Sequence, residues 1–149
     1  MFVRFFGYSK LKGYFCKQKN INMTQQQLKE LLRSQQGELD AVLMYQRLAE
    51  IVKTERERET FLQLAKEEGR HASVFHGYTQ TVLQPKKTMA RVMPVLYRLL
   101  GKKRLYRLIA KGEYDAGIQY EHLVKDFPEV ASVLADETRH GDMVSALID

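Results

Sequence analysis

The sequence predicts an all-α protein, a bundle of four long helices, from two observations. Apolar residues recur at the 3.6-residue spacing of a helix in four long segments, and no stretch alternates apolar and polar residues as a half-buried strand does. The chain also repeats itself. Residues 37–48 (GELDAVLMYQRL) and 112–123 (GEYDAGIQYEHL) agree at six of twelve positions in register, and each copy is followed by Glu-x-Arg-His. The two halves of the chain are therefore expected to be similar helix pairs.

The first pair of helices is bounded by a cap and a breaker. We expect its first helix over residues 24–53, where Thr24 and Gln27 match a capping box. A short polar turn leads into the second helix, expected over 57–83, and Pro85 is expected to end it. Because the turn is short, the two helices should form an antiparallel hairpin.

The second pair follows the same plan. We expect its helices over 103–125 and 128–147, with Pro128 suited to a first helical turn. A longer link over 86–101 joins the two pairs, and its sequence predicts a short amphipathic helix that is interrupted near Pro94.

Glycines open the two copies of the repeat. Gly37 and Gly112 each cost about 1 kcal/mol inside a helix relative to alanine. Their repetition predicts that helices approach one another closely at these two points.

Length and composition indicate one domain of ordinary globular character. The chain has 149 residues, of which 44% are hydrophobic and 28% charged, and no apolar run approaches the roughly 18 residues that a membrane span needs. The single cysteine, Cys16, excludes an internal disulfide and a four-cysteine iron or zinc site within this chain. This composition predicts a cytoplasmic location, and peripheral attachment to a membrane is compatible with it.

The net charge of +6 is concentrated at the amino terminus. Residues 1–22 carry five Lys or Arg and no acid, whereas residues 23–149 carry 19 basic and 18 acidic residues. This balance does not predict nucleic-acid binding. Residues 1–22 lack the apolar stretch of a signal peptide. We expect them to be a disordered tail before a domain over 23–149, with Met23 as the functional start; a membrane-surface or targeting role is the alternative.

Acidic and histidine side chains interrupt the apolar helix faces in a repeated order, Glu, Glu-x-x-His, Glu, Glu-x-x-His. They are Glu38, Glu68, His71, Glu113, Glu137 and His140. Glu and His three residues apart share one face of a helix, and four helices that contribute such groups can surround two metal ions. Carboxylates that face one core without cations would repel each other and lose roughly several kcal/mol each in desolvation. The alternative is a solvated network of ion pairs with Arg70 and Arg139.

The donor set favours paired iron, with manganese as an alternative. Structural zinc sites normally use four ligands, whereas mixed carboxylate and imidazole ligation by six groups suits two iron or manganese ions. Glu67 and Asp136, which precede the two Glu-x-x-His glutamates, could accept the remaining imidazole N–H groups. Tyr45 and Tyr120 lie two helical turns beyond the first and third glutamates and could donate hydrogen bonds to the cluster; simple core packing is the alternative.

With these residues the chain resembles the ferritin-like di-iron carboxylate superfamily, most closely rubrerythrin-type proteins, over about residues 24–147. It is also similar to the ferritin-like domain fused to some membrane transporters of the vacuolar-iron-transporter type. Demethoxyubiquinone hydroxylases share the same ligand order. The resemblance implies a ferritin-like four-helix bundle in which the long link is the crossover.

The resemblance also implies a role for each ligand. Glu68 and Glu137 would bridge the two iron ions, whereas Glu38, Glu113 and the two histidines would each bind one ion. Rubrerythrins carry a further glutamate three residues after the third-helix ligand, where this chain has Ala116. The six remaining ligands resemble the ferroxidase centre of bacterioferritin, so the resemblance supports paired iron more firmly than peroxide reduction.

Three functions are compatible with this pattern. The first is a di-iron protein that reacts with peroxide or dioxygen and takes electrons from a separate donor, since a four-cysteine module is missing. The second is an iron-binding module that delivers iron to a membrane transporter or store. The third is a hydroxylase of a hydrophobic quinol. A homodimer is plausible from the apolar outer faces.

One basic segment bears on the choice between these functions. Residues 86–111 hold nine Lys or Arg and no acid, interleaved with apolar residues. A basic amphipathic helix is typical of membrane-surface binding. A solvated cap over the end of the bundle is the alternative.

Overall fold

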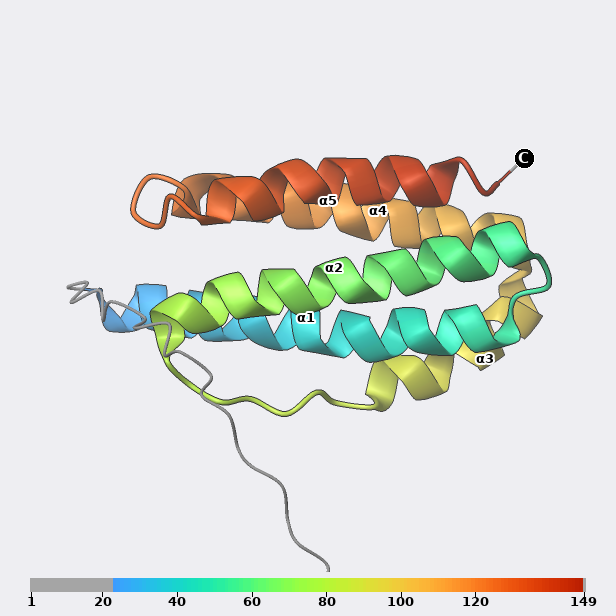
Figure 1. The fold of residues 1–149 in the computed structure, drawn as a ribbon, viewed down its shortest axis with the longest axis horizontal. Helices are drawn as coiled ribbons and strands as arrows, with labels where there is room; N and C mark the ends of the chain where they lie inside the picture. Colours follow the sequence, from blue (N-terminus) through green and yellow to red (C-terminus); the bar gives the residue numbers. More distant parts are fainter. Residues whose placement is uncertain (1–22, 149) are drawn as a thin grey trace, which may run out of the picture.

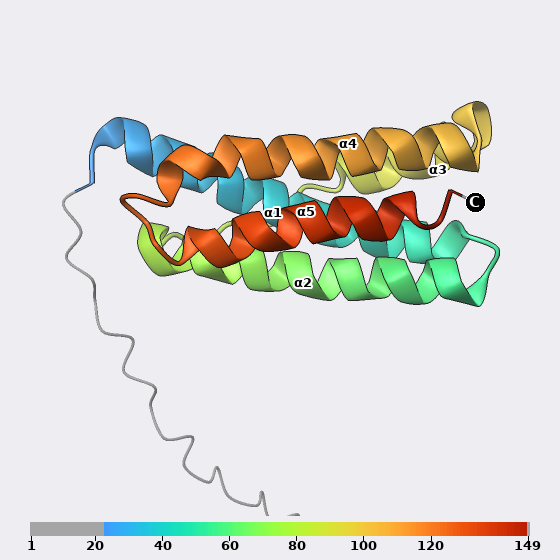
Figure 2. The same cartoon turned by 90° about the horizontal axis from the view of Figure 1, so that it is seen from above.

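The computed structural model describes residues 23–148, so the expectations for residues 1–22 lie outside the described range. This range contains no strand and has five α-helices and one 3-10 turn: α1 (Gln25–Ile51), α2 (Glu55–Thr79), α3 (Thr88–Leu100), α4 (Lys102–Tyr120), η1 (Glu121–Leu123) and α5 (Val130–Ser145). Helices α1 and α2 form one antiparallel hairpin and α4 and α5 form the other, side by side (Figures 1 and 2). The predicted all-α bundle is confirmed.

Capping boxes start both helices of the first hairpin. Gln27 N–H donates to Thr24 Oγ1 at 3.1 Å and Thr24 N–H donates to Gln27 Oε1 at 2.9 Å, as predicted. A second box, which the sequence prediction missed, pairs Thr54 with Glu57 and starts α2 two residues early. Each box satisfies amide groups that the first helical turn leaves without partners.

Helix α2 ends at Thr79, and the predicted extension to residue 83 is wrong. Gln80 adopts a left-handed conformation with φ of 51°, which stops the helix before Pro85 can do so. The Gln80 side-chain amide donates to the Gly77 carbonyl at 2.7 Å, and Gln35 on α1 donates to the Thr81 carbonyl at 2.9 Å. These contacts satisfy carbonyl groups at the helix end and just beyond it.

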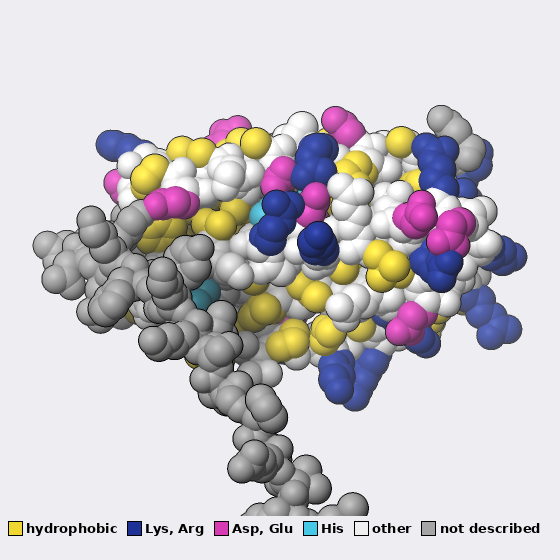
Figure 3. Space-filling view, in the orientation of Figure 1, with side chains coloured by type: hydrophobic (Ala, Val, Ile, Leu, Met, Phe, Trp, Pro, Cys, Tyr) yellow, Lys and Arg dark blue, Asp and Glu magenta, His cyan; other side chains and the backbone are white. Residues whose placement is uncertain are grey.

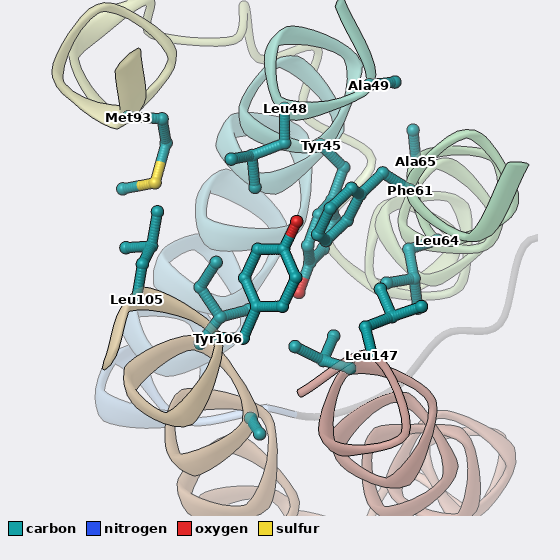
Figure 4. Close-up of a cluster of buried hydrophobic side chains, with 13 residues drawn as sticks. Tyr45, Leu48, Ala49, Phe61, Leu64, Ala65, Met93, Leu105, Tyr106 and Leu147 are labelled. Atoms are coloured by element: carbon teal, nitrogen blue, oxygen red, sulfur yellow. The ribbon is translucent and has the colours of Figure 1, made fainter. Parts of the chain in front are cut away.

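The long link crosses the bundle and carries α3, as predicted. The link follows α1 before α3 begins, and α3 lies against α1 and then meets α4 (Figures 1 and 2). The expected interruption at Pro94 is wrong, because α3 is continuous from Thr88 to Leu100. Proline removes one intrahelical hydrogen bond here. The burial of Met93, next to it, keeps the flanking turns in place (Figure 4).

Two apolar clusters fill the bundle at its two ends. The first, around Tyr45, Phe61 and Tyr106, lies toward the α1–α2 turn and is drawn in Figure 4. The second, around Phe75 and Phe127, lies toward the opposite end. A buried polar layer separates them. None of the described helices is both long and apolar enough to cross a membrane.

Candidate metal centre

The structure brings all six predicted ligand residues together in this polar layer. Helix α1 supplies Glu38 and α4 supplies Glu113, while α2 and α5 each supply one Glu-x-x-His pair. Each of the six is buried, with exposed fractions between 0% and 9%. On each helix the polar residue falls between apolar residues of the two clusters. The packing of both clusters therefore fixes the depth at which the polar groups lie.

Glu68 lies between the two histidines. Its Oε2 is 3.4 Å from His71 Nδ1, and its Oε1 is 3.0 Å from His140 Nδ1. One carboxylate thus presents one oxygen to each imidazole. Glu137 Oε1 is 3.1 Å from the same nitrogen of His71, Nδ1.

The remaining two glutamates divide between the histidines. Glu38 Oε2 lies 3.6 Å from His71 Nδ1, and Glu113 Oε2 lies 3.7 Å from His140 Nδ1. The two imidazole rings are stacked, with centroids 5.2 Å apart and planes 21° apart. The centre therefore consists of two adjoining halves, each with one histidine and one glutamate of its own.

Four buried ligand atoms in this centre approach one another closely but make no hydrogen bond within residues 23–148. They are Glu68 Oε1, His71 Nδ1, Glu137 Oε1 and His140 Nδ1. A buried polar atom left unpaired costs about 1–3 kcal/mol. The same four residues offer ligand atoms that all lie within 4.8 Å of one another. Carboxylate oxygens and imidazole nitrogens so arranged fit metal ions, which would satisfy all four atoms.

Burial and mutual contact shift the pKa values of these groups. Burial raises the pKa of Glu38 well above its usual value, and burial together with the Glu68 charge raises the pKa of Glu137. Burial alone would lower the pKa of His71, but the surrounding carboxylates raise it to about 12. Burial would also lower the pKa of His140, but its carboxylate neighbours raise that pKa to about 10. Without metal, protons balance the negative charge that cations would otherwise balance.

The outer nitrogen of each histidine faces a carboxylate from the opposite hairpin. His140 Nε2 lies 2.8 Å from Glu67 Oε2, and His71 Nε2 lies 3.2 Å from Asp136 Oδ2. Arg139 Nη2 lies 2.7 Å from Glu67 Oε2 and 2.6 Å from Asp136 Oδ1. The two carboxylates stay ionised and favour an N–H at each Nε2, which leaves each Nδ1 directed into the centre.

The two repeated tyrosines also reach across the bundle. The Tyr45 hydroxyl donates to Glu113, and the Tyr120 hydroxyl donates to Glu38. Both tyrosines are buried. Each therefore fixes the orientation of the one glutamate that the opposite hairpin contributes from its first helix.

The comparisons with known proteins agree with this geometry. The family profile described as rubrerythrin matches residues 29–148. The chain belongs to the rubrerythrin family. No curated protein and no solved structure gives a significant match. The buried cluster of Glu68, His71, Glu137 and His140 fits a metal site in a chain of this family.

The structure also shows where this rubrerythrin-family chain departs from the sequence expectations. The arginines that would have made the cluster a network of ion pairs lie one layer further out. Arg139 holds the two outer carboxylates, and Arg70 Nη2 lies 3.2 Å from Glu67 Oε1. The role of Arg139 in linking the histidine partners was missed, although its place in Glu-x-Arg-His was the available signal. The predicted close helix approach at Gly37 and Gly112 is wrong, because an added Cβ there would meet nothing within 4 Å.

Proposed function

We propose that this protein binds two iron ions in the centre and reacts with peroxide or dioxygen. The observation that carries the proposal is the set of four buried donor atoms without partners, aimed into a centre that repeats itself across the two hairpins. Glu68 and Glu137 would help to hold the ions. Glu38 with His71, and Glu113 with His140, would each complete one half. Manganese is the alternative metal.

When bound, a pair of iron ions supplies electrons for the reduction of peroxide or dioxygen. The protein's own residues set the conditions for that chemistry. Glu67 and Asp136 keep a proton on each histidine Nε2, and the two tyrosine hydroxyls hold the glutamates in place. The apolar clusters on both sides limit the access of water. Because the chain has one cysteine, electrons would come from a separate donor.

Anaerobic titration with iron(II) tests the binding. We expect two ions per chain, measured by elemental analysis after desalting, and then a change in near-ultraviolet absorption when peroxide or air is added. His71→Ala should lose metal. His76→Ala is the matched control, because His76 lies on the same helix and its Nδ1 contacts the Thr81 carbonyl at 3.0 Å instead of the centre. A parent protein that binds no iron would rule out the proposal.

Delivery of iron to a membrane transporter or store is the second candidate, and the exposed basic surface around α3 favours it. The two candidates differ in what happens to the iron. A carrier would release iron(II) to an acceptor without consuming peroxide, whereas a redox enzyme would consume peroxide repeatedly while its iron stays bound. Parallel assays of iron retention and peroxide consumption would separate them.

A further inference from the structure

Helix α3 has one broad apolar face, and the bundle covers only part of it. Met93 is buried, and Leu96 and Tyr97 pack beside it against the first core cluster. The other apolar side chains point to solvent, with exposed fractions from 39% to 73%: Met89, Val92, Val95 and Leu99. Their spacing of three or four residues places them along one stripe of the helix. A helix that served only as a cap would need the inner face alone.

Along one edge the exposed stripe is bordered by cations that have no acidic partner in the described range. Within residues 86–111 every charged residue is basic, and within residues 23–148 no acidic side chain pairs with Lys87, Arg91 or Arg98. By contrast, Lys102 lies 3.0 Å from Glu57 and is neutralised. Over the surface of α2 and α5, by contrast, acidic and basic side chains are interspersed (Figure 3).

Taken together, exposed apolar side chains and unpaired cations on one helix match the chemistry of an anionic lipid surface. We propose that the outer face of α3 binds the surface of an anionic lipid bilayer. Val95 and Leu99 enter the acyl boundary, while Arg91 and Arg98 contact lipid phosphates. A second copy of this chain is a poorer occupant of the face, since pairing two such helices would bring like charges together. The proposal does not depend on metal binding.

Co-sedimentation of the full chain with vesicles tests the proposal. We expect binding to vesicles of phosphatidylglycerol and phosphatidylcholine at low salt, little binding to phosphatidylcholine alone, and loss of binding in high salt. Arg91→Glu with Arg98→Glu should weaken binding by about 30-fold or more. Val95→Ser with Leu99→Ser should weaken it by about 10-fold.

Matched double variants elsewhere on the surface serve as controls. Lys29→Glu with Lys66→Glu makes the same change in net charge on α1 and α2, and Leu62→Ser with Ile118→Ser removes apolar side chains that are 49% and 66% exposed. Both controls should bind as the parent does, and circular dichroism should show all variants folded. The proposal is overturned if the parent does not bind, if neutral vesicles bind equally well, or if the Arg91 and Arg98 variant keeps full binding.

Discussion

At the scale of single residues, the carboxylates that contact the two histidines differ in distance and in burial. Glu67 lies 2.8 Å from His140 and is mostly buried, whereas Asp136 lies 3.2 Å from His71 with 29% of its side chain exposed. A shorter contact in a drier setting is electrostatically stronger. His140 should therefore be held more firmly in its metal-binding orientation than His71.

This difference predicts unequal effects of removing the two charges. Glu67→Gln should lower metal affinity by about 10- to 100-fold, and Asp136→Asn should lower it less, because partners of ligating histidines carry effects of that size. Competition with a chromophoric chelator for manganese(II) or iron(II) measures the metal affinity of both variants. Glu59→Gln, at an exposed position of the same helix, is the control. Equal affinity of Glu67→Gln and the parent would show that the outer carboxylates do not orient the ligands.

At the scale of the helices, Gly141 on α5 lies directly against the ring of Tyr114 on α4. A Cβ added there would lie 2.4–2.7 Å from ring atoms of Tyr114, whose hydroxyl donates to Asp142 Oδ1 at 2.8 Å. The close approach that the sequence suggested at the repeated glycines occurs here instead, outside the repeat. The packing partner is a side chain of the other helix, which helical periodicity does not reveal.

Gly141→Ala is therefore expected to destabilise the protein by about 1–3 kcal/mol, since overpacking outweighs the gain in helix propensity. Gly112→Ala is the matched control. It lies on the same hairpin with open space around it and should stabilise the protein by about 0.5–1 kcal/mol. Urea unfolding gives both values. If the two variants are equally stable, Tyr114 moves aside without cost and the contact is not tight.

At the scale of the whole molecule, Glu57 ties the two hairpins together at one end. Its carboxylate accepts hydrogen bonds from the backbone N–H and the hydroxyl of Thr54 at the start of α2, and another of 2.9 Å from the Tyr106 hydroxyl on α4. Lys102 Nζ, also on α4, lies 3.0 Å from the same carboxylate. Burial alone would raise the pKa of Glu57, but these hydrogen bonds lower it to about 2. The ionised form is thus favoured by folding.

The lowered pKa of Glu57 predicts how the stabilising effect of this carboxylate changes with pH. The contribution of ionised Glu57 to folding stability is fully present above pH 4.5, the ordinary pKa of the group, and is lost as pH falls toward about 2. At pH 7, Glu57→Gln should lower the free energy of unfolding by about 1–3 kcal/mol, and the difference from the parent should shrink between these pH values. Urea unfolding at several pH values measures this difference in the free energy of unfolding, and Glu59→Gln, at an exposed position, is the control. A difference that stays constant with pH would contradict the assignment.

Patterns of residues close together in the sequence predicted most of the helices of this molecule. Helical periodicity and capping signals predicted the four long helices and the single crossover, because both are set by neighbours within a few residues along the chain. The errors lie where distant contacts override local rules. Gln80 ends α2 before Pro85 is reached, and packing of Met93 carries α3 through Pro94.

The sequence by itself also placed each Glu-x-x-His pair on one helix face, because residues three apart on a helix share a face. Only the tertiary structure decided the partners. Tyr45 binds Glu113, Glu67 holds His140, and each such contact joins residues 65 or more positions apart. Likewise, amphipathicity predicted α3 without deciding which apolar stripe the bundle would cover. Periodicity records the face of one helix, whereas packing selects the helix that lies opposite that face.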